Sequence, residues 1–100
     1  MNEITVLGVL ESIGPLEETS SGIKVVNFVI TANRPFKSSQ SADEFKVTAF
    51  KELAEDISSA GIVGTSVLVK GRLQSNNYRK DDKVYYSPEL LAEKILYVCR

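Results

Sequence analysis

The chain has 100 residues, of which 43% are hydrophobic and 25% are charged, and its formal net charge is −1. This composition is typical of one soluble globular domain, so we expect a single domain over residues 1–100. No apolar run approaches the roughly 20 residues of a membrane span, and we expect a cytoplasmic protein without a membrane partner. The chain has no histidine, and Cys99 is its single cysteine, so we expect no metal site, no cofactor and no disulfide.

Charge is segregated along the chain. Residues 19–51 carry five Lys or Arg against two Asp or Glu, residues 70–83 carry the same numbers, and the remainder carries two against nine. Two segments can therefore build a local positive field on an acidic protein. The alternative is that two solvated loops are basic without binding anything.

The first half of the chain predicts two strands with half-buried faces. The first strand, Glu3–Glu11, has an inward row of Ile4, Val6, Gly8 and Leu10 and an outward row of Glu3, Thr5, Leu7 and Val9. Leu7 and Val9 make the outward row partly apolar, which favours pairing with another copy of the chain; the alternative is a strand that its own chain covers on both faces. The second strand, Ile23–Asn33, has an inward row of Val26, Phe28, Ile30 and Ala32.

A polar loop separates these strands from a strand that runs into a helix. The loop carries Phe36 between Arg34 and Lys37, where the ring is either a plug into the domain or a platform for a ligand. From Glu44 the period is two, with Phe45, Val47 and Ala49 on one face and Lys46, Thr48 and Phe50 on the other. The period then becomes helical through Leu53, Ile57 and Ala60, and Gly61 suits a left-handed helix end.

The second half predicts two strands joined by a long hairpin. Ser66–Ser75 has an inward row of Val67, Val69, Gly71 and Leu73 and an outward row of Lys70, Arg72 and Gln74. Residues 76–83 form a polar hairpin tip, where Tyr78 lies beside Arg79 and Lys80. Val84–Tyr86 starts the return strand, Pro88 predicts a bulge or an edge, and Leu90–Val98 closes the core.

These elements predict an all-β fold with one short helix. Five antiparallel-type strands, with the helix between the third and fourth and a long hairpin between the fourth and fifth, fit a closed Greek-key barrel of the OB type. Closure would also remove the exposed edges of so small a sheet.

Three aromatic rings, Phe36, Phe50 and Tyr78, stand at outward or loop positions with cations close in sequence. Single-stranded nucleic acid needs this combination, because cations follow the phosphates and flat rings stack on unpaired bases. Catalysis has little support, since the chain has no histidine, no nucleophile elbow and no glycine-rich phosphate loop, so we do not expect an enzyme.

The sequence resembles the bacterial single-stranded DNA-binding proteins over nearly its full length. The segments that carry the resemblance are MNEITVLGVL, TSSGIKVVNFVITANRPFK, AFKELAE, VLVKGRLQSNNY and SPELLAEKI. The resemblance implies base stacking by Phe36, Phe50 and Tyr78. It implies contacts with phosphates or polar groups from Arg34, Lys37, Lys46, Thr48, Lys70, Arg72, Gln74, Arg79 and Lys80. It also implies a homodimer or homotetramer whose first strands pair through Glu3, Thr5, Leu7 and Val9.

The sequence departs from the family pattern at several positions. Val9 stands where a basic residue is usual, Glu17 and Glu18 where an aromatic or basic residue is usual, and Glu44 where a stacking aromatic is usual. The chain ends at Arg100, so we expect it to lack the acidic tail through which the family recruits replication proteins. We expect binding to be weaker and more sensitive to salt than in the family.

The sequence leaves two functions open. The first is sequence-independent binding and protection of single-stranded DNA on the bacterial nucleoid, in replication, repair or recombination. The alternative is an OB-fold interaction subunit of a primosome or replisome, for which nucleic acid is secondary. RNA remains open within the binding class, since nothing in the sequence excludes a 2′-hydroxyl.

Overall fold

The computed structural model describes residues 1–33 and 42–98, and the structural statements below concern these residues. In chain order their elements are β1 (Ile4–Ile13), β2 (Glu17–Glu18), β3 (Lys24–Asn33), β4 (Ala42–Phe50), α1 (Glu52–Ala60), β5 (Ser66–Ser75), β6 (Tyr78–Lys80), β7 (Lys83–Tyr85) and β8 (Pro88–Tyr97).

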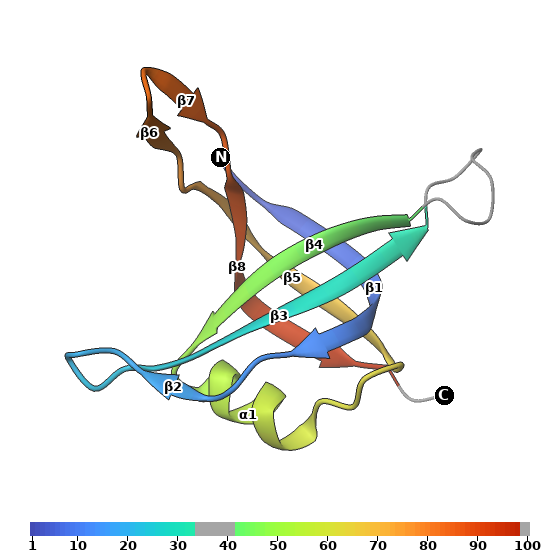
Figure 1. Ribbon diagram of the computed structural model, residues 1–100. Coiled ribbons are helices and arrows are strands. Elements are labelled where there is room, and N and C mark those ends of the chain that lie inside the picture. The colour runs from blue at the N-terminus through green and yellow to red at the C-terminus, as the bar shows by residue number, and fades with distance from the viewer. Residues whose placement is uncertain (34–41, 99–100) are drawn as a thin grey trace.

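Five long strands close into a barrel (Figure 1). β5 lies between β1 and β8, β8 pairs with β4, β4 pairs with β3, and β3 pairs back with β1. The predicted OB-type barrel is confirmed, with the helix between β4 and β5 and the long hairpin between β5 and β8. The prediction of antiparallel strands throughout is wrong at one place, because β4 and β8 pair in parallel through two residue pairs.

The barrel interior is filled by the residues that the period-two patterns place inward. The most buried side chains are Leu10, Val26, Phe28, Ile30, Val47, Ala49, Ala54, Ile57, Val67, Val69, Leu90 and Ile95. Leu73 differs from the prediction, since it is 44% exposed although it continues the inward row of β5. Leu73 lines a hollow together with Ile4, Phe45 and Leu90, so its side chain stays accessible to solvent.

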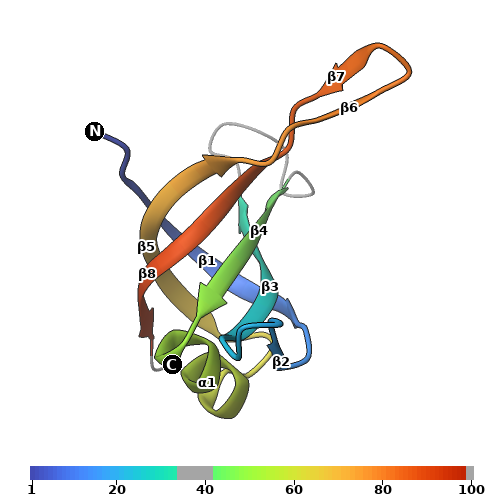
Figure 2. The ribbon, with the colours of Figure 1, turned by 90° about the vertical axis from the view of Figure 1, so that its left-hand side faces the viewer.

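Helix α1 lies across one end of the barrel, and the β6–β7 hairpin projects from the other end (Figure 2). The helix buries Ala54 and Ile57, whereas Ala60, predicted on the apolar stripe, is exposed. Gly61 is also different from the prediction, because its φ of −69° is extended rather than left-handed. Glycine is needed at this position for steric reasons, since a Cβ there would lie 2.6 Å from the Ile57 carbonyl oxygen and 2.8 Å from Ile13 Cδ1.

Of the two alternatives predicted at Pro88, a bulge and an edge, the structure shows the edge, because Pro88 pairs with β5 alone and the pairing of β8 with β4 begins at Leu90. Pro88 is the first residue of β8, where a strand needs no N–H donor, and it pairs with Ser75. The irregularity in this pairing lies further along, where Lys70 pairs with Lys94 but Gly71 pairs with Ala92. The two backbones approach closely there, since a Cβ on Gly71 would lie within 3 Å of the Leu91 carbonyl group. Only glycine fits that contact without moving a strand.

Candidate nucleic-acid interface

Several predicted contact residues share the outer surface of β4, β8 and β5. Lys46 and Phe50 are exposed on β4, and the Phe50 side chain is 40% exposed. Thr48 is in register with Leu91 of β8, which is in register with Arg72 of β5, so Arg72 projects from the same surface. Gln74 follows Arg72 on the outward row of β5, and both are exposed. We call Lys46, Phe50, Arg72 and Gln74 together the cationic face.

Thr48, which was also predicted as a contact, is almost completely buried and is not exposed on this face. Its exposure is 4%, and its hydroxyl group is hydrogen-bonded to Asn27 Oδ1 at 2.7 Å and to Glu89 Oε1. Asn27 is opposite Thr48 on β3, and Glu89 reaches it from β8. The outward period of β4 is correct, but neighbouring polar side chains on both sides cover this position.

Lys70 lies on the outward row of β5 but further from the hairpin than Arg72. Its strand partners are Thr5 on β1 and Lys94 on β8, on the far side of the register shift at Gly71. The side chain is exposed. The structure therefore aligns Lys70 with the β1 side of the barrel rather than with Lys46 and Phe50.

The β6–β7 hairpin carries the third group of predicted residues. Tyr78, Arg79 and Lys80 form β6 and are all exposed. The Tyr78 ring stacks on the Tyr85 ring with centroids 5.1 Å apart and an interplanar angle of 14°. Tyr85 escaped the sequence reasoning, which treated residues 84–86 only as the start of a return strand. The signal that could have identified it is its spacing, because a two-residue turn at Asp81 and Asp82 places Tyr85 directly opposite Tyr78.

Three predicted residues, Arg34, Phe36 and Lys37, lie outside the described residues. The strands that flank them are described, and Asn33 at the end of β3 pairs with Ala42 at the start of β4. This pair lies at the hairpin end of the barrel, away from α1 (Figure 2).

The same end of the barrel is hollowed. The hollow has a volume of about 350 Å³ and is lined by Ile4, Glu44, Phe45, Lys46, Leu73, Pro88 and Leu90. Phe45 is half-buried there, in agreement with its predicted inward direction, and Glu44 is exposed. An acidic side chain therefore stands next to Lys46 at the position where the family pattern leads one to expect a ring.

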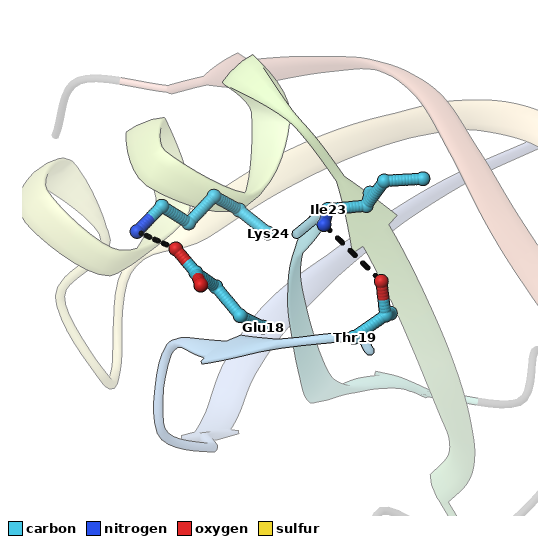
Figure 3. Close-up of polar contacts among 4 residues, drawn as sticks. All are labelled: Glu18, Thr19, Ile23 and Lys24. Carbon is cyan, nitrogen blue, oxygen red and sulfur yellow. Dashed lines mark hydrogen bonds and ion pairs between the residues drawn. The ribbon is translucent and has the colours of Figure 1, made fainter. Parts of the chain in front are cut away.

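One basic residue near the cationic face is already paired. Lys24 Nζ lies 2.7 Å from Glu18 Oε1, and the Ile23 amide donates a hydrogen bond to Thr19 Oγ1 in the same turn (Figure 3). The hydrogen bond and the charge of Lys24 lower the pKa of Glu18, and the same contacts with Glu18 raise the pKa of Lys24. The charge of Lys24 is therefore already neutralised by Glu18 at the β2–β3 turn.

Another part of the outer surface, over β1, β5 and β8, carries apolar side chains. Leu7 on β1, Leu68 on β5 and Leu96 on β8 are direct partners across three neighbouring strands, and Leu7 is 61% exposed. Val9 continues this surface along β1 and is also exposed, whereas Glu3 and Thr5 form its polar end. We call Leu7, Leu68 and Leu96 the leucine row. The sequence reasoning identified its β1 member but missed Leu68 and Leu96, since their adjacency depends on strand order.

Two further classes of site find no support in the described part of the chain. No group of three or more His, Cys, Asp or Glu side chains there has the arrangement of a metal site. None of its helices has the length and apolarity to span a membrane. The chemistry that the surface offers is stacking by exposed rings, charge neutralisation by Lys and Arg, and apolar contact by the leucine row.

Comparison with known proteins identifies a family and several similar proteins. The family model described as Single-strand binding protein family matches residues 1–98. Over 102 aligned residues the chain is 31% identical to "Single-stranded DNA-binding protein 3" of Listeria innocua and to "Single-stranded DNA-binding protein 1" of Staphylococcus aureus, and 30% identical to "Single-stranded DNA-binding protein" of Oceanobacillus iheyensis. Each match covers 98% of this chain but 64%, 65% and 63% of the respective relative. The chain therefore spans less than two thirds of the length of these relatives.

Proposed function

Because the chain belongs to the Single-strand binding protein family, we propose that it binds single-stranded DNA without strong sequence preference. Bound along the strand, it protects the bases and prevents pairing during replication, repair or recombination on the cytoplasmic nucleoid. It acts by binding alone, without a catalytic step. The observation that carries the proposal is the cationic face, where an exposed ring on β4 and cations on β4 and β5 share one surface.

The physical basis of binding is stacking combined with charge neutralisation. Phe50 lies near the helix end of the barrel and Tyr78 on the hairpin at the other end, and Lys46, Arg72 and Gln74 lie between them. A strand that runs along this surface meets rings that accept any base, because every base has a flat π-face. The cations replace counterions around the phosphates, so affinity depends on salt and hardly on sequence.

The test is titration of labelled oligo-dT across a salt series. We expect the logarithm of affinity to fall linearly with the logarithm of salt concentration. Phe50→Ala should weaken binding by about 1–3 kcal/mol, the usual contribution of one stacked base. Val63→Ala is the matched control, since Val63 is an exposed apolar residue in the loop between α1 and β5. No binding by the wild-type protein would overturn the proposed function, and an unchanged Phe50→Ala would overturn the cationic face.

We propose further that the protein is a homodimer or homotetramer joined through the outward row of β1, Glu3, Thr5, Leu7 and Val9. The leucine row supports this interface, because it extends the apolar surface from β1 over two more strands. An apolar surface shared by three strands is better suited to a second protein surface than to water.

A second candidate function is an OB-fold interaction subunit that binds a replisome protein and for which nucleic acid is secondary. The acidic groups beside the cationic face favour it, since Glu44 is exposed next to Lys46 and Glu89 lies between β4 and β5. The test is a pull-down from nuclease-treated lysate combined with the oligo-dT titration. Capture of a replisome protein without a shift of oligo-dT would select this function over the first.

A further inference from the structure

The β6–β7 hairpin has two chemically different faces. Tyr78 pairs with Tyr85, Arg79 with Val84, and Lys80 with Lys83. Because side chains alternate along a strand, the two tyrosines and the two lysines share one face, and Arg79 and Val84 share the other. We call Tyr78, Tyr85, Lys80 and Lys83 the hairpin platform.

The tyrosine pair is a preformed stacking surface. The two rings are nearly parallel, at 14°, yet Tyr78 and Tyr85 remain 56% and 42% exposed. Each ring therefore contacts its partner with one side and leaves the other side open to solvent. Since the partner already restricts its rotation, a ring in this pair loses less side-chain entropy when a base stacks on it than a lone surface ring does.

The lysine pair lacks a counter-ion. Lys80 and Lys83 are directly opposite each other, an arrangement of like charges that destabilises a strand pair. Asp81 and Asp82 fill the two central turn positions, with φ values of 53° and 63°, and no ion pair joins either of them to these lysines in the described part of the chain. An anion bound between the lysines would relieve the repulsion.

We propose that the hairpin platform is a self-contained nucleotide site, in which a base stacks on the Tyr78–Tyr85 pair and the adjoining phosphate lies between Lys80 and Lys83. Rings and lysines are two residues apart on each strand, about 6.6 Å, and a lysine side chain is long enough to reach a phosphate next to a stacked base. The site adds Tyr85 and Lys83 to the binding residues. The inference rests on the proposed function, since the nucleotide belongs to a single strand of DNA.

The test compares oligo-dT with an abasic oligonucleotide of the same length, which keeps the phosphates and lacks the bases. We expect Tyr85→Leu to weaken oligo-dT binding roughly 5-fold or more, the lower range for one stacked base, and to leave the weaker abasic binding unchanged. Tyr85→Phe should bind like the wild type, because it keeps the ring. Lys83→Gln should weaken binding to both oligonucleotides and reduce the salt slope by about 0.7, the value for one phosphate contact.

Two controls separate the platform from general effects. Tyr86→Leu removes a tyrosine that is more exposed, at 78%, but follows the last residue of β7 and is not part of the tyrosine stack, and Lys94→Gln removes the same charge from a remote part of β8. Both should bind oligo-dT within about twofold of the wild type, as expected for surface positions outside an interface. If Tyr85→Leu weakened abasic binding as well, Tyr85 would only hold the hairpin together, and the inference would be wrong.

The outcomes also separate this inference from the function on which it rests. If the wild type binds oligo-dT and Phe50→Ala weakens binding, but Tyr85→Leu and Lys83→Gln have no effect, only the hairpin platform is overturned. A loss with Tyr86→Leu as large as with Tyr85→Leu would overturn the assignment of the stacking role to the Tyr78–Tyr85 pair. If the wild type does not bind oligo-dT at all, the proposed function and the platform both fail.

Discussion

At the scale of single residues, the hydroxyl group of Thr48 joins three strands of the barrel. It lies on β4 and contacts Asn27 on β3 and Glu89 on β8, and it is almost completely buried. A hydroxyl has one hydrogen, so Thr48 donates to one of these two oxygens at a time, and the three groups form a polar cluster around one shared donor. We therefore expect Thr48 to stabilise the wall beneath the cationic face rather than to contact a ligand.

This role predicts the behaviour of Thr48→Val, which keeps the shape of the side chain and removes its hydroxyl. We expect the free energy of unfolding to fall by about 1–3 kcal/mol, because the partly buried oxygens of Asn27 and Glu89 lose the donor that they share. Urea unfolding measures the loss. Thr31→Val is the control, since the Thr31 hydroxyl makes no hydrogen bond within the described part of the chain. Equal stability of the two variants would show that the cluster contributes nothing to stability.

At the scale of elements, the β2–β3 turn is held by the ion pair between Glu18 and Lys24 (Figure 3). Both side chains remain accessible to solvent, at 38% for Lys24 and 54% for Glu18, so the pair contributes little to global stability. The lowered pKa of Glu18 means that this contribution is present above the ordinary carboxyl range and is lost as the pH falls through the lowered value. The raised pKa of Lys24 means that it is also lost as the pH rises through that higher value.

The pair predicts that two lysines close to the cationic face differ in their contribution to binding. Lys24→Met should return the pKa of Glu18 toward its ordinary value, which an NMR titration of the carboxyl group measures. The same variant should leave the salt slope of oligo-dT binding unchanged, because the lost charge was already neutralised. Lys46→Met should reduce that slope by about 0.7, the value for one phosphate contact on a single strand. A reduction with Lys24→Met alone would mean that the strand passes over the β2–β3 turn.

The elements also show what sequence reasoning reaches and where it ends. The long strands and the helix were predictable, because alternation in rows such as Val26, Phe28 and Ile30 is a local property of the chain. The parallel β4–β8 pairing, the stack of Tyr78 on Tyr85 and the burial of Thr48 were not, because each depends on a partner far away in sequence or across a turn. The short strand β2 was missed for the same reason, since only its pairing with Lys24 and Val25 makes Glu17 and Glu18 a strand.

At the scale of the whole molecule, the barrel separates two kinds of surface. The leucine row covers β1, β5 and the end of β8, whereas the cationic face lies over β4, the start of β8 and the end of β5. β5 belongs to both, because its outward row changes from Leu68 to Lys70, Arg72 and Gln74 within a few residues. Association through the leucine row therefore leaves the cationic face open.

This separation predicts that assembly can be weakened without a direct loss of the nucleotide surface. Leu96→Glu should lower the mass of the protein measured by light scattering, because a charge in the leucine row opposes burial of that surface. Val63→Glu makes the same chemical change on an exposed loop and should leave the mass unchanged. An unchanged mass for Leu96→Glu would place any contact between copies elsewhere on the barrel.

The side chain of Asn2 ties the start of the chain to the place where the hairpin leaves the barrel. Its Nδ2 donates to the Leu73 carbonyl oxygen at 2.6 Å, and its Oδ1 accepts from the Leu73 amide at 3.0 Å. A purification tag or fluorophore fused ahead of Met1 would emerge next to this contact, at the end of the barrel from which the hairpin projects (Figure 2). Labels for binding measurements therefore belong on the loop between α1 and β5, where they neither disturb the two hydrogen bonds between Asn2 and Leu73 nor obstruct the oligonucleotide.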